Sequence, residues 1–457
     1  MSKNENKMDK LVALLKRRGF VYPGSEIYGG LANTWDYGPY GAQLKKNIID
    51  AWWKKFVESR ADMVGMDSAI LMNPKVWEAS GHVDNFTDPL IDCKKCKERF
   101  RADHLAEEQN IALEGVSKLP CPKCKGELTE PRTFNLMFET HIGPISSDAK
   151  PVFLRGEIAQ GMFVNFKNIT DTMRVKLPFG IAQYGKAFRN EITAGNYLFR
   201  QVEFNLMEME YFIAPPKDDS EWQKVFEEWL EDMKDWIKSL GIKEDEVYYH
   251  EIDKNELAHY SKRTIDIEYN YPFGLKELYG LAYRTDFDLK RHMEASGIDL
   301  RIMDSVTGEK VLPHVIEPSF GIDRTFLATL LSAYKEEDVP TANEDEVDTR
   351  YVLSLPTHLA PVQIAVLPLF KKEHLQQRAN EITKELRAKY RIEYDETGSI
   401  GKRYRRQDEV GTPYCVTIDF ETENDNAVTI RERDSMNQER VQIDNLMKWF
   451  EQKISSL

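Results

Sequence analysis

The sequence has no run of about 18 apolar residues, the length that a helix needs to cross a bilayer. The segment 1–20 also lacks the apolar core of a secretory signal peptide. We therefore expect a cytoplasmic protein without a membrane partner.

An excess of positive charge is also absent, because the 457 residues carry a formal net charge of −14. This charge argues against non-specific coating of DNA, and we expect no DNA partner, although it does not exclude binding of RNA in a local cleft. Hydrophobic residues make up 41% of the chain and charged residues 30%, which is ordinary for a soluble globular protein. The length predicts two or three domains.

Cysteine is scarce, and four of the five cysteines form two CxxC pairs, Cys93 with Cys96 and Cys121 with Cys124. Two such pairs, separated by 24 residues, supply the four thiolates of a closed structural Zn2+ site. Disulfides are the alternative, which a reducing cytosol disfavours. The fifth cysteine, Cys415, lies in an apolar strand-like segment and is expected in the core.

The common phosphate-binding loops are missing, since neither GxxxxGKS/T nor GxGxxG after a strand occurs. The segment 183–211 instead predicts two strands joined by a loop at 193–197, with Arg189 and Glu191 on one face of the first strand. On the second strand, Arg200, Phe204 and Glu208 share a face, whereas Phe199, Met207 and Met209 take the opposite, core face. These side chains on one surface suit a nucleotide. The arginines can bind phosphate oxygens, the ring can stack on a base, and a carboxylate can accept from an exocyclic amine. A surface hairpin held by ion pairs is the alternative.

A second anion-binding feature lies at 315–334, where a strand ending at Glu317-Pro318 leads into a helix that begins near Gly321. Arg324 falls in the first helical turn, where free backbone N–H groups already favour anions. The alternative is a strand–helix corner with a surface arginine.

The rest of the N-terminal part predicts mostly antiparallel strands with intervening helices, which is an α+β fold. Helices are expected at 8–18 and from Gly41 onward. The apolar stripe of the second, Leu44 to Phe56, suits either the core or a twin subunit. Strand-like runs occupy 163–169, 264–272 and 277–289. Two insertions are expected, a cysteine module at about 93–131 and a helical segment at 215–251.

The acidic run 335–350 predicts a solvated boundary, after which alternating strands and helices form an α/β module at 351–457. Its strands are expected within 362–370, 391–395, 413–420 and 427–434, with a helix at 374–390 and another at the end. A loop at 398–411 places four basic residues close together, Lys402, Arg403, Arg405 and Arg406. They predict either a contact with a phosphate backbone or a solvated basic face.

Several of these segments resemble a known family. FRNE at 188–191, the return strand at 199–204 and GIDR at 321–324 resemble motifs 2 and 3 of class II aminoacyl-tRNA synthetases. Together with YPGSEIYGG, TWDYGPYGAQLKKNI, ILMNPKVWEASGHVDNF, RADHL, KLPFGIAQ and GTPYCVTID, they are similar to the glycyl-tRNA synthetases of the single-chain homodimeric type. The resemblance runs from about residue 18 to residue 445.

The resemblance implies a class II antiparallel sheet flanked by helices at 1–340 and an anticodon-binding domain at 351–457. It also implies a homodimer that uses ATP with Mg2+, glycine and tRNA(Gly). Activation of glycine as an adenylate, with release of pyrophosphate, would precede transfer of glycyl to the 3′ end of the tRNA. A synthetase for serine, threonine or proline, or a non-catalytic RNA-binding relative, remains as an alternative.

Specific residues follow from the resemblance. Arg189 would bind the α-phosphate of ATP, and Arg324 would bind the γ-phosphate. Glu191 would accept a hydrogen bond from the adenine amine. Glu277 would help to bind ATP through Mg2+. The implied ATP site comprises Arg189, Asn190, Glu191, Phe199, Arg200, Gln201, Val202, Glu203, Phe204, Glu277, Leu278, Gly321, Ile322, Asp323 and Arg324. The implied glycine pocket comprises Arg101, Glu157, Phe204, Glu208, Glu317 and Ser319. Val202 and Leu206 depart from the family pattern, in which arginine and glutamine are usual, and the valine side chain cannot supply the hydrogen bonds of that arginine.

Overall fold

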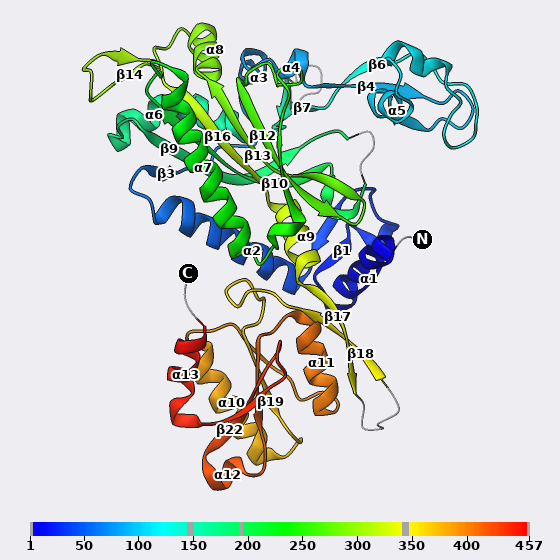
Figure 1. The fold of residues 1–457 in the computed structure, drawn as a ribbon, viewed down its shortest axis with the longest axis vertical. Coiled ribbons are helices and arrows are strands. Elements are labelled where there is room, and N and C mark those ends of the chain that lie inside the picture. The colour runs from blue at the N-terminus through cyan, green and yellow to red at the C-terminus, as the bar shows by residue number, and fades with distance from the viewer. Residues whose placement is uncertain (1–2, 144–149, 192–194, 341–346, 455–457) are drawn as a thin grey trace.

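The computed structural model describes residues 3–143, 150–191, 195–340 and 347–454. It consists of a large N-terminal part and a smaller C-terminal part, joined by a hairpin (Figure 1). Within the described residues, no helix is both long enough and apolar enough to cross a bilayer.

The N-terminal part is organised around a seven-stranded sheet, in the order β11-β12-β13-β16-β10-β9-β3. Neighbouring strands are antiparallel except β3 and β9, which are parallel. Their bounds are Val247–Glu251, Arg263–Tyr271, Gly274–Thr285, His314–Gly321, Glu203–Ile213, Phe179–Phe188 and Met63–Gly65. The fold class predicted from the sequence is confirmed.

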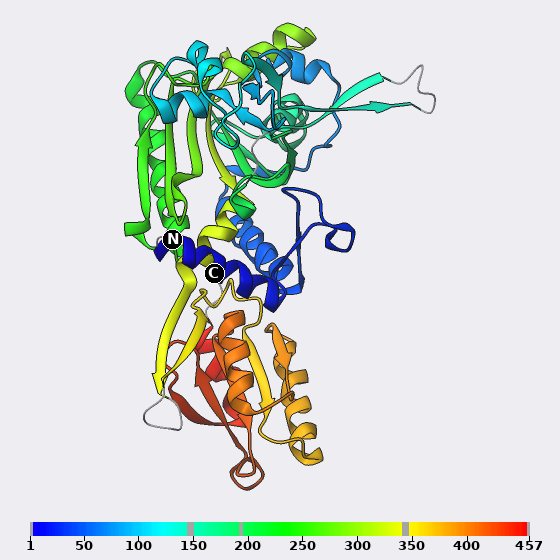
Figure 2. The same ribbon diagram turned by 90° about the vertical axis from the view of Figure 1, so that its right-hand side faces the viewer.

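Helices cover both faces of this sheet (Figures 1 and 2). One face packs against α2, α7 and α9, at Pro39–Trp53, Asp219–Ser239 and Ile322–Ala333. Helix α1, at Lys3–Arg18, lies beside the short strand β1, Val21–Pro23 (Figure 1). The other face packs against α6 and α8, at Ala159–Met173 and Phe287–Ser296. Strand β10 contributes to the hydrophobic cores on both faces of the sheet. Met207 and Met209 belong to the core on the first face, and Phe212 belongs to the core on the other face. The stripe of α2 is core, since Leu44, Ile48 and Trp52 are fully buried within this chain.

The cysteine-containing module projects from one end of the sheet (Figure 1). It contains the three-stranded sheet β5-β4-β6, at Arg99–Arg101, Thr87–Asp92 and Arg132–Asn135, and helix α5 at Ala102–Gln109. Strands β7 and β8, at Phe138–Ile142 and Lys150–Leu154, form a separate hairpin. Short elements occur elsewhere, at Val21–Pro23, Trp35–Tyr37, Lys75–Ala79, His82–Asn85, Ile302–Met303 and Lys310–Val311.

The C-terminal part is a five-stranded sheet in the order β20-β19-β21-β22-β23, with β19 parallel to both neighbours. Its strands are Ile392–Tyr394, Ile364–Pro368, Tyr414–Ile418, Ala427–Glu432 and Gln438–Gln442. Its helices are α10 at Glu373–Arg387, α11 at Ile400–Val410, α12 at Thr422–Asp425 and α13 at Leu446–Lys453. Cys415 is buried, as expected.

Three local predictions are wrong. The run 163–169 is not a strand but part of α6, because Phe163 and Phe166 recur at helical spacing and bury one face. The acidic run predicted as a solvated boundary is not among them: its described parts form strands β17, Tyr334–Pro340, and β18, Val347–Leu353, of the connecting hairpin, and Glu336, Asp338 and Asp348 are exposed. The basic segment 398–411 is mostly helix α11.

The third wrong prediction concerns the strands of 183–211. Strand β9 ends at Phe188 and β10 begins at Glu203, so Arg189, Glu191 and Arg200 lie on the connection rather than on strands. Phe199 lies in a short 3-10 helix, Tyr197–Phe199, which Asn196 enters with a left-handed φ of 57°. Residues 193 and 194 of the predicted loop lie outside the described residues.

Candidate active site

A pocket of about 380 Å³ lies over β10, β13 and β16, next to the first turn of α9. Most of the residues predicted from the sequence line it: Arg101, Arg189, Glu191, Phe199, Arg200, Gln201, Phe204, Glu208, Glu277, Leu278, Ser319, Gly321, Asp323 and Arg324. The fold therefore brings segments from distant parts of the sequence to one cavity.

Arg324 and Arg189 are both held by backbone and aromatic contacts. Arg324 Nη1 lies 3.0 Å from Glu277 Oε2 and donates to the Glu277 carbonyl at 3.1 Å. Arg189 Nε donates to the Gly156 carbonyl at 3.1 Å, and its guanidinium lies 5.1 Å and 5.2 Å from the rings of Phe86 and Phe204. Among the described contacts, Arg189 makes no hydrogen bond through its two terminal nitrogens, which leaves that fork for an anionic ligand.

Glu191 offers an acceptor in the same cavity. Its Oε2 is buried and has no hydrogen-bond partner among the described residues, and the nearest cationic nitrogen, Arg200 Nε, lies 3.9 Å away. An orphaned buried acceptor in a pocket is suited to a ligand donor such as an amine.

Glu208 lines the end of the cavity near Ser319, and two further carboxylates, Glu157 and Glu317, lie behind it. Glu208 accepts from Ser319 Oγ at 3.0 Å and from the Ile158 N–H at 3.2 Å. Burial, reinforced by the charge of Glu317, raises the pKa of Glu208 to about 8. Glu157 lies 3.3 Å from His82 Nε2. An acidic hollow of this kind favours a small cation, such as an ammonium group.

Six predicted residues do not line the cavity: Asn190, Val202, Glu203, Ile322, Glu157 and Glu317. The backbone N–H of Asn190 donates to the Leu136 carbonyl, and the Val202 carbonyl accepts from the Arg189 N–H. Glu203 is exposed and pairs with Lys186, and Ile322 is in the core.

Glu317 and Glu157 lie in a buried layer behind the cavity wall, which the sequence did not reveal. The guanidinium of Arg284 donates to Glu317 Oε1 at 2.8 Å and holds both carboxylate oxygens of Asp288, at 2.8 Å and 2.9 Å. Gln160 bridges Glu157 to Asp288, at 2.9 Å and 3.0 Å. Arg284 lies on β13 and Asp288 in the first turn of α8, so their spacing is not that of two residues on one helix and gave no signal in the sequence.

Asp323 faces the cavity but is mainly occupied by protein contacts. It accepts from the Asn205 N–H at 2.6 Å and from Tyr37, and Lys45 Nζ lies 3.5 Å away. It therefore fixes β10 and the first turn of α9 to each other.

The four paired cysteines form one cluster in the projecting module. Their sulfur atoms all lie within 4.8 Å of one another, with Cys93 to Cys124 at 3.5 Å and Cys96 to Cys121 at 3.8 Å. Four sulfurs at about 2.3 Å around a tetrahedral ion would stand about 3.8 Å apart. The cluster could therefore hold a metal ion.

The basic segment of the C-terminal part is less available than predicted. Arg403 is buried and donates to the carbonyls of Pro368, Leu369 and Asp395. Arg406 pairs with the Asp395 carboxylate. The prediction of a solvated phosphate contact is wrong for Arg403, whose guanidinium satisfies buried carbonyls, whereas Lys402 remains exposed.

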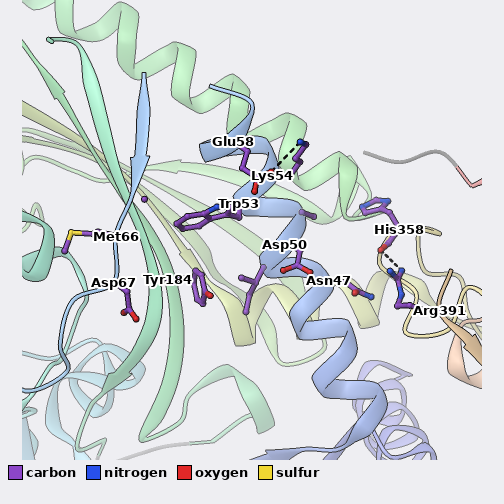
Figure 3. Close-up of a pocket in the computed structure, with 13 residues that line it drawn as sticks. Asn47, Asp50, Trp53, Lys54, Glu58, Met66, Asp67, Tyr184, His358 and Arg391 are labelled. Carbon is purple, nitrogen blue, oxygen red and sulfur yellow. Dashed lines mark hydrogen bonds and ion pairs between the residues drawn. The ribbon is translucent and has the colours of Figure 1, made fainter. Parts of the chain in front are cut away.

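A larger pocket, of about 700 Å³, lies along α2 and contains none of the predicted site residues (Figure 3). Asn47, Asp50, Trp53 and Lys54 line it from α2 and the turn that follows, and Tyr184 lines it from β9. His358 and Arg391 close the side nearest the C-terminal part.

Comparison with known proteins agrees with this architecture. Residues 150–334 match the family model of the class II tRNA synthetase core domain (G, H, P, S and T), and residues 363–453 match that of the anticodon binding domain. In solved structures, prolyl-tRNA synthetase from Cryptosporidium parvum has a TM-score of 0.65 at 15% identity, covering 99% of this chain and 78% of that one.

Curated relatives extend over nearly the whole chain. The glycine–tRNA ligase of Caldanaerobacter subterraneus subsp. tengcongensis is 54% identical, over 98% of both chains. That of Geobacillus kaustophilus is 52% identical, over 98% of this chain and 99% of its own length. That of Treponema denticola is 51% identical, over 96% of both chains. This chain belongs to the glycine–tRNA ligase family of class II aminoacyl-tRNA synthetases.

Proposed function

We propose that this protein is a glycine–tRNA ligase, which activates glycine with ATP and transfers the glycyl group to the 3′ end of tRNA(Gly). The observation that carries this proposal is a single cavity in which two arginines suited to phosphates meet Glu208, a carboxylate suited to a small ammonium group and backed by Glu157 and Glu317. We assign residues 1–340 to catalysis and residues 351–457 to anticodon binding, in the cytoplasm.

In the first step, a glycine carboxylate oxygen would attack the α-phosphorus of ATP, and the α–β bridging oxygen would leave with pyrophosphate. Arg189 would bind the α-phosphate and Arg324 the γ-phosphate, so that both stabilise the charge that develops at phosphorus. In the second step, a terminal ribose hydroxyl of the tRNA would attack the glycyl carbonyl and release AMP. These steps need positioning and charge stabilisation rather than a protein nucleophile.

Mg2+ would accompany ATP and neutralise part of its phosphate charge. Glu277 has two acidic neighbours, and such a group of carboxylates suits a cation. Glu268 stands opposite Glu277 in the register of β12 and β13, and Asp266 lies close by on β12. Burial, reinforced by the charges of Glu277 and Glu268, raises the pKa of Asp266 to about 7. Glu277 would hold the ion, while its contact with Arg324 keeps the two groups together.

Pyrophosphate exchange measured with each of the twenty amino acids tests the proposal. We expect glycine to stimulate exchange far above all others, because added carbon atoms would meet Ser319 and Glu208, whose side chains are hydrogen-bonded to each other at 3.0 Å in the cavity wall. Stimulation by serine, threonine or proline would instead favour another class II specificity. RNA binding without exchange would favour the non-catalytic alternative.

The affinity for glycine should depend on pH. Because the pKa of Glu208 is raised to about 8, this carboxyl is mostly protonated at pH 6.5, and binding of an ammonium group requires it to lose the proton. The KM for glycine should therefore fall by about 25-fold between pH 6.5 and 8.5, in proportion to the ionised fraction of Glu208. Replacement of Glu208 by glutamine should weaken glycine binding and abolish this pH dependence. An equally steep profile in that variant would contradict the assignment.

We expect the cysteine cluster to bind one structural Zn2+ per chain, because four thiolates and no open position are typical of such sites. Metal analysis of the purified protein should give about one zinc, and Cys96→Ser should lower this amount strongly. Cys415→Ala is the matched control, because Cys415 is buried in the C-terminal part, and its zinc content should be unchanged. A fully folded protein with four free thiols and no metal would contradict this prediction.

We propose that the molecule is a homodimer, with the pocket along α2 at the interface (Figure 3). Strand β3 ends the large sheet and has no neighbour on its outer side among the described strands. The pocket carries both acids, such as Asp50 and Glu58, and bases, such as Lys54 and Arg391. A surface with both charges can complement itself across a two-fold axis.

Tyr184→Glu should convert the dimer into monomers in sedimentation, because Tyr184 is 45% exposed inside this pocket. Tyr248→Glu is the control, since Tyr248 is 48% exposed at the opposite edge of the same sheet, on β11. A stable, active wild-type monomer would contradict the proposal.

A further inference from the structure

We propose that metal in the four-cysteine cluster positions Arg101 in the active site, so that metal occupancy controls the affinity for glycine. This inference rests on the proposed function and assigns the metal a role in substrate binding beyond general stability.

The cluster closes the hairpin that carries Arg101. Cys93 directly follows β4, and Arg101 ends β5, five positions after Cys96. Within the turn, the Cys93 N–H donates to the Glu98 carbonyl at 2.8 Å, and the Lys97 N–H donates to the Cys93 carbonyl at 3.0 Å. The paired strands place Arg101 opposite Leu90. The position of β5 therefore depends on the turn that the cysteines form.

Arg101 lies at the opposite end of this hairpin, in the wall of the catalytic cavity. Its Nη1 lies 2.7 Å from Asp88 Oδ2, and its Nε donates to Asp103 Oδ1 at 3.1 Å. Asp88 and Arg101 both line the cavity, together with Glu191 and Arg200. Only 17% of the Arg101 side chain is exposed, so its position is set by these neighbours.

The cysteine module has few other buried residues that could hold β5 and Arg101 in place. Its buried core consists of Ile91, Cys93, Ala102, Leu105, Ala106, Val116, Cys121 and Leu128. Two of the cluster cysteines thus belong to the core itself, and Ala102, next to Arg101, packs in the same core. Small units with so few apolar residues generally need a disulfide or a metal to remain ordered. Loss of the metal should therefore release β5 and displace Arg101.

The test combines metal removal with substitution of Arg101. Zinc is removed from the full-length protein with 1,10-phenanthroline under reducing conditions, with excess Mg2+ present, and is then restored. In the wild type, removal should raise the KM for glycine at least tenfold, change the KM for ATP by less than threefold, and be reversed by zinc. Arg101→Ala with zinc bound should show the same rise in the KM for glycine.

The combination is decisive, because two changes that act through one residue are not additive. Removal of zinc from Arg101→Ala should leave its KM for glycine unchanged. Arg99→Ala is the matched control. This arginine is on the same strand and pairs with Asp92, outside the cavity, and its response to zinc should equal that of the wild type.

Two further readouts do not depend on turnover. Binding of a non-hydrolysable glycyl-adenylate analogue, measured by calorimetry, should weaken without zinc in the wild type but not in Arg101→Ala. Hydrogen exchange should rise in the segment 87–103 and remain unchanged in β10 and β16. Three results would overturn the inference. The effects of zinc removal and of Arg101→Ala could multiply, the KM for glycine could be insensitive to zinc, or ATP binding could be lost in parallel. Absence of glycine-dependent exchange in the zinc-loaded wild type would instead refute the proposed function.

Discussion

Replacement of Arg189 by alanine is expected to lower kcat/KM for glycine-dependent pyrophosphate exchange by about a thousandfold. Loss of a single preorganised donor to developing charge typically costs 10²–10³ in rate, and a guanidinium can offer two parallel hydrogen bonds to a phosphate. Arg189 is well prepared for this role, because the Gly156 carbonyl and the rings of Phe86 and Phe204 fix its orientation before ATP binds. Water would fill the space in the variant but could not supply the charge.

Two companion variants define what this effect means. Arg189→Lys should recover only a small part of the activity, because an ammonium group keeps the charge but not the fork. Lys186→Ala is the control. Lys186 lies on β9 just before Arg189, is exposed and pairs with Glu203, so the activity of this variant should stay within twofold of the wild type. If Arg189→Ala retained more than a tenth of the activity, Arg189 could not be the ligand of the α-phosphate.

The site was predictable where residue types alone constrain the chemistry. Arg324 was assigned to the first turn of a helix because Glu317-Pro318 and the apolar spacing after Gly321 mark a strand followed by a helix, and β16 and α9 confirm this. The paired cysteines were recognised from spacing, since four thiols at such intervals have few other uses. Most of the detailed residue set, by contrast, came from the family resemblance.

The failures have a common physical cause, which is that tertiary contacts decide what local patterns leave open. The segment 163–169 alternates enough to suggest a strand, yet Phe163, Phe166 and Phe212 pack into one core, and this favours helix α6. Arg403 lies among other basic residues, but its guanidinium satisfies carbonyls that only the folded chain brings together. Arg284 was overlooked because its partner Glu317 lies 33 positions away.

Replacement of Asp408 by asparagine is expected to destabilise the C-terminal part by about 3–5 kcal/mol. Asp408 is fully buried on α11 and accepts from Arg350 Nε at 2.7 Å, and from Arg431 Nη1 and Nη2 at 2.9 Å and 3.1 Å. Asparagine keeps the size but removes the charge that compensates two buried arginines. Glu337, which lies 2.8 Å from Arg350, offers only partial compensation because it is one-third exposed.

The position of Asp408 gives this variant a functional signature as well. Arg350 belongs to the connecting hairpin and Arg431 to β22, so the carboxylate ties the hairpin to the C-terminal sheet. Glycine-dependent pyrophosphate exchange should remain within twofold of the wild type, whereas kcat/KM for tRNA should fall at least tenfold. Denaturant unfolding and the two assays together check this. Asp425→Asn is the control, because Asp425 pairs with Arg440 near the surface and should cost less than about 1 kcal/mol. Equal losses in exchange and in aminoacylation would mean that the buried ion pairs support the whole fold, and not the placement of the anticodon-binding part.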